Sequence, residues 1–229
     1  MTAVPSPRQR RSEVTREGIG VAIAVGAIGI SFGALSTASG FSILQTCAMS
    51  VLIFTGGSQF TLVGVVAAGG GAAAAVATGV LLGLRNALYG LGLAPMLRLT
   101  RGRRVVAAQL VIDESTAVAV ANSDDDALAR WGFWLTGVAV FVTWNALTLL
   151  GAVLGEAAGD PRRWGLDAAV PAAFLSLLWP RLRERRSLAV AVGAGTVAVV
   201  ATPWLRPGAP VLLAATVALV AAATQGRSS

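Results

Sequence analysis

Long apolar runs, separated by short polar segments, dominate this chain of 229 residues. A helix needs about 20 mostly apolar residues to cross a bilayer, and several of the runs approach or exceed that length. The pattern predicts an all-α fold, a polytopic bundle of membrane helices with about six full spans. The expected spans are residues 18–36, 72–97, 105–121, 131–155, 187–202 and 209–224.

The apolar run at residues 41–64 differs from the others because polar residues and a glycine pair interrupt it. Gly56, Gly57, Ser58 and Gln59 are poor material for an uninterrupted membrane helix, so we expect two helical pieces joined by a break. Non-helical backbone at membrane depth is tolerated only where it is buried in protein or lines a cavity. A broken helix near the midplane is also a strong sequence indication of a transporter's binding site.

The arginine clusters predict how the chain crosses the membrane, since cytoplasmic loops hold most Arg residues. If every run crossed fully from an inner N-terminus, the cluster at 98–104 would lie outside. If 41–64 dips in and returns, that cluster lies inside, and a second re-entrant segment at 165–180 keeps the cluster at 181–186 inside too. Two re-entrant segments that enter from opposite faces are compatible with an inverted repeat.

This topology divides the chain into one transmembrane transport domain and two tails. Residues 1–17 are polar and rich in Arg, and predict a disordered, cytoplasmic N-terminal tail. Residues 18–224 form the transmembrane domain, and 225–229 a short cytoplasmic tail. The acidic loop at 124–126 is expected outside and residues 156–163 inside. A topology of full crossings with one misplaced Arg cluster is the alternative.

Composition supports a membrane protein and argues against several other classes. The chain is 55% hydrophobic and 13% charged, with a mean hydropathy of +0.72, which is too apolar for an ordinary soluble domain. The net charge of +7 comes from Arg clusters between apolar runs, so it indicates topology rather than nucleic-acid binding. With only Cys47 and no histidine, the sequence predicts no metal site, no cofactor and no catalytic residues, and an enzyme is not expected.

Arg85 lies in the middle of a predicted span, where a charged side chain costs at least about 2.5–3.5 kcal/mol on insertion scales. It therefore needs a partner, and the neighbouring span holds Asp113 and Glu114. At 1.5 Å per residue the depths of these groups differ by about 6 Å, which an Arg side chain can bridge. Two roles are open for this ion pair. It could be purely structural and fix the register of the two helices, or it could contact a zwitterion or a coupling ion.

Two sets of residues are candidates for a binding function. The candidate substrate-binding residues are Gly56, Gly57, Ser58, Gln59, Arg85, Asn86, Tyr89, Asp113 and Glu114. The candidates for a coupling ion are Asp113, Glu114 and Asp167, the last of which could instead cap a helix. Gln109, Asp113 and Thr116 would form one polar stripe on a continuous helix. Leu52, Phe54 and Phe60 are expected to line an apolar pocket.

Several motifs in the same order resemble the AzlC family of branched-chain amino acid exporters. They are Gly29–Gly33 (GISFG), Met49-Ser50, Phe54–Phe60 (FTGGSQF), Leu84–Tyr89 (LRNALY), Asp113-Glu114 and Gly165–Asp167 (GLD) with the later Phe174. The resemblance covers roughly residues 18–200. It implies a multi-pass protein of the bacterial cell membrane that exports Val, Leu or Ile, with Met as a further candidate, together with a small membrane protein of the AzlD type.

One position departs from the family pattern, which usually has His after the residue that corresponds to Arg85. This chain has Asn86 there, so proton transfer would fall to Asp113, Glu114 or Asp167. The alternative function is a membrane scaffold or assembly subunit without a transport path of its own. Such a subunit should tolerate joint replacement of Arg85 and its partners by apolar residues.

Overall fold

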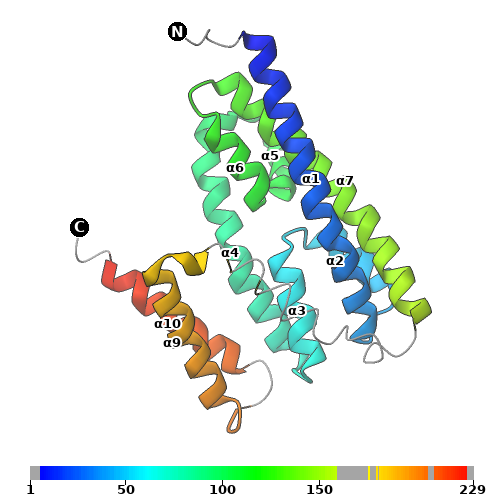
Figure 1. Ribbon diagram of the computed structural model, residues 1–229, viewed down its shortest axis with the longest axis vertical. Helices are drawn as coiled ribbons and strands as arrows, with labels where there is room; N and C mark the ends of the chain where they lie inside the picture. The colour runs from blue at the N-terminus through cyan, green and yellow to red at the C-terminus, as the bar shows by residue number, and fades with distance from the viewer. Residues whose placement is uncertain (1–5, 159–174, 176–178, 180, 206–208, 226–229) are drawn as a thin grey trace.

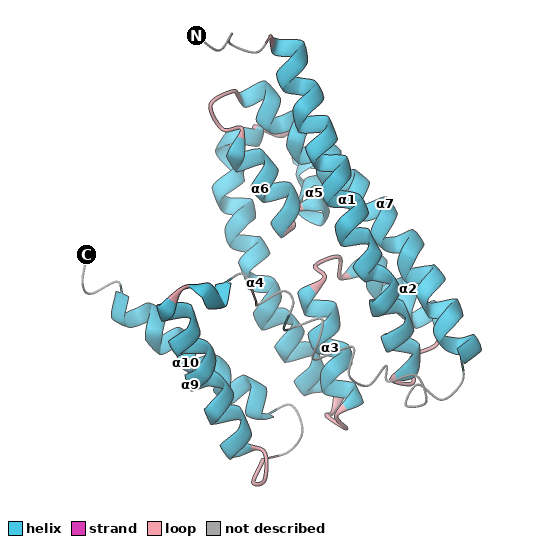
Figure 2. Cartoon of the chain, in the orientation of Figure 1, coloured by secondary structure: helices cyan, strands magenta, loops and turns pink. Residues whose placement is uncertain are grey.

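The computed structural model describes residues 6–158, 175, 179, 181–205 and 209–225. Within these residues every regular element is a helix (Figure 2). The helices are α1 (Pro7–Ala38), α2 (Ile43–Leu52), α3 (Gly57–Ala67), α4 (Ala72–Leu97), α5 (Arg101–Leu110), α6 (Asp113–Ala121), α7 (Asp126–Ala158), the short 3-10 helix η3 (Arg181–Arg183), α9 (Arg185–Ala201) and α10 (Ala209–Gln225).

Three of the described helices, α1, α4 and α7, are long and apolar enough to cross a membrane. Helices α9 and α10 have 17 residues each. They pack against each other, and α10 also contacts α4. The predicted spans at 72–97, 187–202 and 209–224 thus correspond to helices, whereas the count of six full spans is not confirmed.

The first helix begins earlier than expected. Residues 7–17 were predicted to be disordered, but they form the first three turns of α1. The reason is local: the Ser6 side chain accepts a hydrogen bond from the Gln9 N–H, and the Gln9 side chain accepts one from the Ser6 N–H. This reciprocal cap and Pro7 at the first helical position are both strong signals for a helix start.

Helices α1 and α7 lie antiparallel along most of their length (Figure 1). Small residues allow this close approach: a Cβ on Gly29 would lie 2.8 Å from the carbonyl oxygen of Trp144. Thr143 adds a hydrogen bond of 2.8 Å to the carbonyl of Ala22. Close packing of small residues is the usual basis of helix association in membranes, and here it fixes the position of Trp144.

The predicted break in the run 41–64 is present. Helix α2 ends at Leu52 and α3 begins at Gly57. Between them, Gly56 has a φ of +54°, a backbone conformation that residues other than glycine rarely adopt. The two helices form a hairpin that opens at the end of the molecule where α1 stops (Figure 1). The break lies at the inner tip of this hairpin.

The expected continuous span at 105–121 is wrong, because the structure has a second broken hairpin there. Helix α5 ends at Leu110 and α6 begins at Asp113. The Ser115 hydroxyl accepts a hydrogen bond from the Ile112 N–H and donates one of 2.6 Å to the Leu110 carbonyl. This buried hydroxyl satisfies backbone groups that the break releases, which membrane-depth breaks require.

The two hairpins enter from opposite ends of the molecule (Figure 1). Hairpin α2–α3 opens where α1 ends, and hairpin α5–α6 opens where α4 ends. An inverted arrangement is therefore present, but its second member is 101–121. The predicted second re-entrant segment, 165–180, lies outside the described residues except for Leu175 and Trp179.

The acidic loop at 124–126 also lies elsewhere than expected. It was predicted to be on the opposite side from the Arg cluster at 98–104, yet both lie at the same end of the molecule. Asp124 pairs with Arg10 at 2.7 Å, and Asp126 lies 3.6 Å from Arg98. Because 101–121 turns back instead of crossing, α7 runs in the reverse of the expected direction and its end, residues 156–158, lies at the other end.

Candidate functional site

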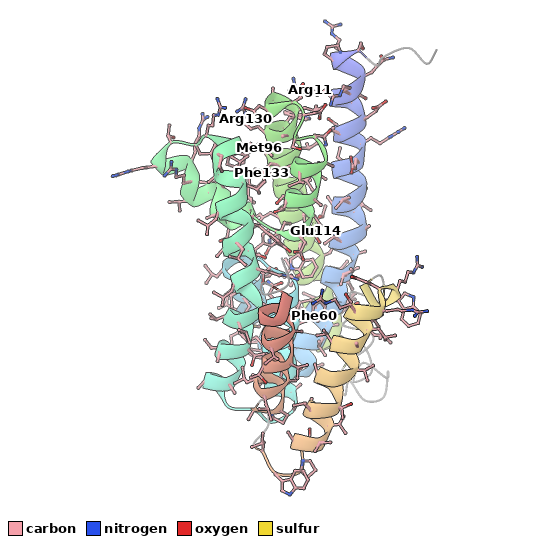
Figure 3. All side chains as sticks on the ribbon, turned by 90° about the vertical axis from the view of Figure 1, so that its left-hand side faces the viewer. Arg11, Phe60, Met96, Glu114, Arg130 and Phe133 are labelled. Carbon is pink, nitrogen blue, oxygen red and sulfur yellow. The ribbon has the colours of Figure 1, made fainter. Side chains whose placement is uncertain are left out.

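A cavity of about 360 Å³ lies where the tips of the two hairpins meet α1, α4 and α7. Its volume is at the small end of the range for ligand pockets, about 300–1,000 Å³. Figure 3 shows Glu114 and Phe60 at mid-height of the molecule. The lining residues are Val25, Ile28, Phe54, Thr55, Gly56, Gly57, Phe60, Leu82, Arg85, Ile112, Asp113, Glu114, Val140 and Trp144.

An ion pair joins α4 to the start of α6 in the wall of this cavity. Arg85 Nη2 lies 2.9 Å from Asp113 Oδ2, as the sequence predicted, and about a third of each side chain is exposed. Asp113 and Glu114 occupy the first turn of α6, where the helix dipole favours a negative charge. The Asp113 carboxylate is therefore stabilised both by the Arg85 guanidinium and by the N-terminus of α6.

Four polar atoms of the cavity wall have no hydrogen-bond partner among the described residues. They are Thr55 Oγ1, Arg85 Nε, Asp113 Oδ1 and Trp144 Nε1. Buried polar atoms are normally bonded to protein, water or ligand. The cavity thus offers a ligand hydrogen-bond donors and acceptors, including one cationic group, Arg85, and one anionic group, Asp113.

The start of α3 faces the same cavity. Gly56 and Gly57 line it, and within the described chain no side chain caps this helix start. The first N–H groups of a helix lack partners inside the helix, so they form a ready site for a carboxylate. Space is limited here: a Cβ on Gly57 would lie 3.3 Å from both Arg85 Nη2 and Leu82 Cδ2.

The remainder of the cavity wall is mainly apolar and includes three aromatic side chains, those of Phe54, Phe60 and Trp144. The Phe60 and Trp144 rings lie 6.4 Å apart in an edge-to-face arrangement, and Phe32 packs behind both. Phe54 and Phe60 line the cavity as expected, but Leu52 does not, since it is 74% exposed on the outer surface of α2.

Ser58 and Gln59 were predicted to bind substrate, but neither lines the cavity. Both are fully buried. Gln59 Nε2 donates to the carbonyls of Met49 and Ser50 at 3.1 and 3.3 Å, so it satisfies the end of α2. Gln59 therefore stabilises the break between α2 and α3 by bonding backbone carbonyls at the end of α2, and it does not contact the cavity.

Asn86 and Tyr89 also point away from this cavity. Asn86 lines a separate groove between α4 and α5, and Tyr89 packs against the hydrophobic core. The proposed polar stripe of Gln109, Asp113 and Thr116 is not formed, because the break separates Gln109 from the other two. Asp167 lies outside the described residues.

Sequence reasoning missed Trp144 as part of the site. A signal was present in its position: Trp131 and Trp134 lie near the start of α7, where interfacial tryptophans are common. Trp144 instead lies in the middle of the helix. A tryptophan at membrane depth with an N–H to satisfy is typical of a buried or cavity-lining position.

These features define a polytopic α-helical membrane protein in which two opposed broken hairpins enclose a charged cavity. The chain belongs to the AzlC family, since the model of that family, described as AzlC protein, matches residues 20–158. AzlC is a membrane transport family. The resemblance seen in the sequence motifs is thereby confirmed.

Two curated proteins illustrate the range of relatives. The "Inner membrane protein YgaZ" of Escherichia coli (strain K12) is 28% identical over 201 residues, which cover 81% of each chain. An "Uncharacterized membrane protein" of Archaeoglobus fulgidus is 29% identical over 178 residues, or 75% of each chain. No solved structure matches the chain significantly.

Proposed function

We propose that this protein is a secondary transporter that exports the branched-chain amino acids Val, Leu and Ile, with Met as a further candidate. The observation that carries the proposal is the Arg85–Asp113 pair, which lies beside the uncapped start of α3 in an otherwise apolar cavity. An intramembrane ionisable residue is a functional-site candidate by default, and this pair faces a cavity large enough for a small ligand.

A zwitterionic amino acid with an apolar side chain matches this cavity in three respects. Its carboxylate would bind the N–H groups at the start of α3 and the Arg85 guanidinium. Its ammonium group would bind Asp113 or Glu114. Its side chain would pack against Phe60 and Trp144 and their apolar neighbours.

Such a pocket should distinguish poorly among aliphatic side chains. One methylene in an apolar pocket changes binding by about 1–3 kcal/mol, so overlapping use of Val, Leu, Ile and Met is expected. Asp113 and Glu114 are the described carboxylates that could carry a coupling proton, and Asp167 remains a candidate from the sequence.

The charge distribution supports a cytoplasmic N-terminus in a bacterial cell membrane. Of the ten Arg residues in the described segment 6–158, all except Arg85 lie near the end of the molecule where α1 begins. Cytoplasmic ends of membrane proteins are enriched in Arg. The carboxylates of Asp124 and Asp126 at that end are paired with Arg side chains.

We also propose that a small membrane protein of the AzlD type assembles with this chain. An unpaired stripe on α4 supports an external contact with lipid or protein, since Val76, Val80, Leu84, Leu88 and Leu91 are all more than half exposed. This stripe is apolar throughout, as a surface within a membrane must be.

The test is efflux of preloaded, labelled valine from cells that lack their own exporter, with and without the small partner. Expression of both proteins should accelerate efflux, and excess unlabelled leucine should slow it by competition. Unchanged efflux with both proteins present in the membrane would refute the proposal. A labelled acidic amino acid serves as the negative control, because the cavity offers it no second cation among the described residues.

A further inference from the structure

A second site begins at the Arg-rich end of the molecule and extends along α4 as far as Asn86, the residue that follows the cavity-lining Arg85. It combines a basic depression of about 730 Å³ with an adjoining apolar groove of about 420 Å³, and Leu97 and Leu99 line both. We propose that this composite site binds an anionic phospholipid, with its phosphate in the basic depression and one acyl chain in the groove. The proposal does not depend on the transport function.

The basic depression carries an excess of positive charge. Arg11, Arg98, Arg103 and Arg130 line it, against a single lining carboxylate, Asp125. That carboxylate is already engaged, since its Oδ1 accepts hydrogen bonds from the Ala127 and Leu128 N–H groups at the start of α7.

The nearby Asp126 does not neutralise the depression either. Its Oδ2 lies 3.6 Å from Arg98 and 3.7 Å from Arg130, so one carboxylate is shared between two guanidinium groups. Neither Arg11 nor Arg103 has a carboxylate within 4 Å among the described residues. The depression therefore keeps an excess of positive charge, which a ligand phosphate would reduce.

The surroundings of these Arg residues are those of a membrane interface. The Arg11 guanidinium lies 3.9 Å above the Trp131 ring, and Trp134 lines the same depression. Tryptophan is enriched where the headgroups meet the hydrocarbon region. Figure 3 shows Arg11 and Arg130 together at this end, close to Met96, whose carbonyl accepts a hydrogen bond from Arg130.

The groove continues from this depression toward the middle of the molecule, between α4 and α5. Most of its wall is formed by small and apolar residues such as Gly90, Ala94 and Ala107, and Asn86 lies at its inner end. Arg104 also lines it, and its Nε donates a hydrogen bond to the Leu99 carbonyl. From Leu97 to Asn86 it spans about 16 Å at 1.5 Å per residue. This is roughly half of the hydrocarbon core of about 30 Å, the depth that an acyl chain of one leaflet occupies.

Charge and shape together favour a phospholipid over a soluble anion. A free phosphate would fill the depression and leave the apolar groove empty, and an uncharged lipid would leave the guanidinium groups unpaired. Basic pockets on the cytoplasmic side of membrane proteins commonly hold anionic headgroups. The arrangement of a basic depression above an apolar groove fits a ligand that carries both features.

Native mass spectrometry of the purified full chain, titrated with phosphatidylglycerol or phosphatidylcholine of identical chains, tests this site. Wild type should bind phosphatidylglycerol at least tenfold more tightly. Removal of two charges in Arg98→Gln/Arg103→Gln should weaken that binding by roughly 25-fold, about fivefold per charge. Arg8→Gln/Arg101→Gln, which removes two exposed charges outside the depression, is the matched control.

The groove is tested separately by Gly90→Leu. A Cβ at Gly90 would meet nothing within 4 Å, so this position has open space for a larger side chain that occupies the groove. The substitution should weaken phosphatidylglycerol binding, whereas Gly92→Leu, on the same helix but outside the groove and equally unobstructed, should leave it unchanged. This pair remains informative if the Arg double variant fails to fold.

Three outcomes would overturn the proposal. Equal loss in the Arg8/Arg101 control would show a diffuse surface charge effect instead of a site. Displacement of the lipid by millimolar sn-glycerol 3-phosphate would show a site for a soluble anion. Equal affinity for the two lipids would show an apolar groove without recognition of the phosphate.

Discussion

The side-chain amide of Gln109 in α5 donates a hydrogen bond of 2.6 Å to the carbonyl oxygen of Val51 in α2. This bond joins the two opposed hairpins close to the breaks that border the cavity. The neighbouring carbonyls of Met49 and Ser50 are satisfied by Gln59 of the first hairpin itself. The end of α2 is therefore held by one amide from its own hairpin and by one from the other.

Gln109→Leu should loosen the contact between the hairpins while leaving each hairpin folded. Hydrogen bonds between membrane helices contribute about 0.6 kcal/mol on average, so the loss of stability should be small. The rate of valine efflux should be affected more strongly than the free energy of unfolding, because the bond connects the two hairpins that form opposite sides of the cavity. Thermal unfolding of the purified protein and efflux from vesicles measure the two effects.

Gln59→Leu is the matched variant within one hairpin. Gln59 is fully buried, and its loss removes the donor to the Ser50 carbonyl and one of the two donors to the Met49 carbonyl, which keeps the Ile53 N–H. The free energy of unfolding should therefore fall by about 1–3 kcal/mol. If Gln59→Leu and Gln109→Leu proved equally mild in the unfolding assay, the supporting role assigned to Gln59 would be wrong.

The Arg85–Asp113 pair distinguishes a transporter from a scaffold. Arg85→Met alone leaves Asp113 in the cavity without its cation, and should destabilise the protein by about 3 kcal/mol or less, since both groups are partly exposed. Arg85→Met/Asp113→Leu removes both charges and should restore most of the stability.

Efflux decides between the two functions for this double variant. A transporter should fold and lose valine efflux, because the groups that bind the zwitterion are gone. A scaffold should keep every measurable activity of the assembled complex. Arg10→Gln/Asp124→Asn is the control, since it removes an ion pair of similar length at the surface and should alter neither stability nor efflux appreciably.

Gly57→Ala should weaken substrate binding with little effect on the fold. Its Cβ would press on Arg85 Nη2 at 3.3 Å and occupy the mouth of the α3 N-terminus. The valine concentration for half-maximal transport should rise about tenfold, since a misplaced polar contact is worth about 1.4 kcal/mol. Gly79→Ala, whose Cβ would make an ordinary contact of 3.5 Å with the Ser58 carbonyl, should leave transport unchanged.

Much of this site could be predicted from sequence because membrane-depth charges have few ways to be satisfied. A charged side chain in the middle of an apolar helix needs a partner, and Asp113 was one of two carboxylates on the next segment. A glycine pair followed by polar residues predicted the break at Gly56. These inferences depend on local chemistry, which the sequence states directly.

The second hairpin could not be predicted in the same way. Its break at Val111 and Ile112 has no glycine or proline, and depends on the Ser115 hydroxyl, which bonds backbone groups on both sides. A serine in an apolar run more often bonds its own helix. Because 101–121 was expected to cross the membrane and instead turns back, the expected direction of α7 and the expected side of the acidic loop at 124–126 were also wrong.

Cysteine labelling distinguishes the two topologies. In a Cys47→Ala background, Thr100→Cys and Ser123→Cys should react with a membrane-impermeant maleimide from the same side, since the loops that hold them lie at one end of the molecule. Ala68→Cys, in the turn between α3 and α4, should react only from the opposite side. All three positions are exposed, so reactivity depends on which side the reagent reaches.

Detergent-permeabilised samples control for accessibility, because all three cysteines should then be labelled. Labelling of Ser123→Cys from the side opposite to Thr100→Cys would restore a full crossing at 101–121 and remove the second hairpin. In that case Asp113 would lie within a continuous helix instead of at a helix start. Its charge would then have no helix N-terminus to stabilise it. Labelling from a shared side supports both the hairpin and the place of Asp113 at its tip.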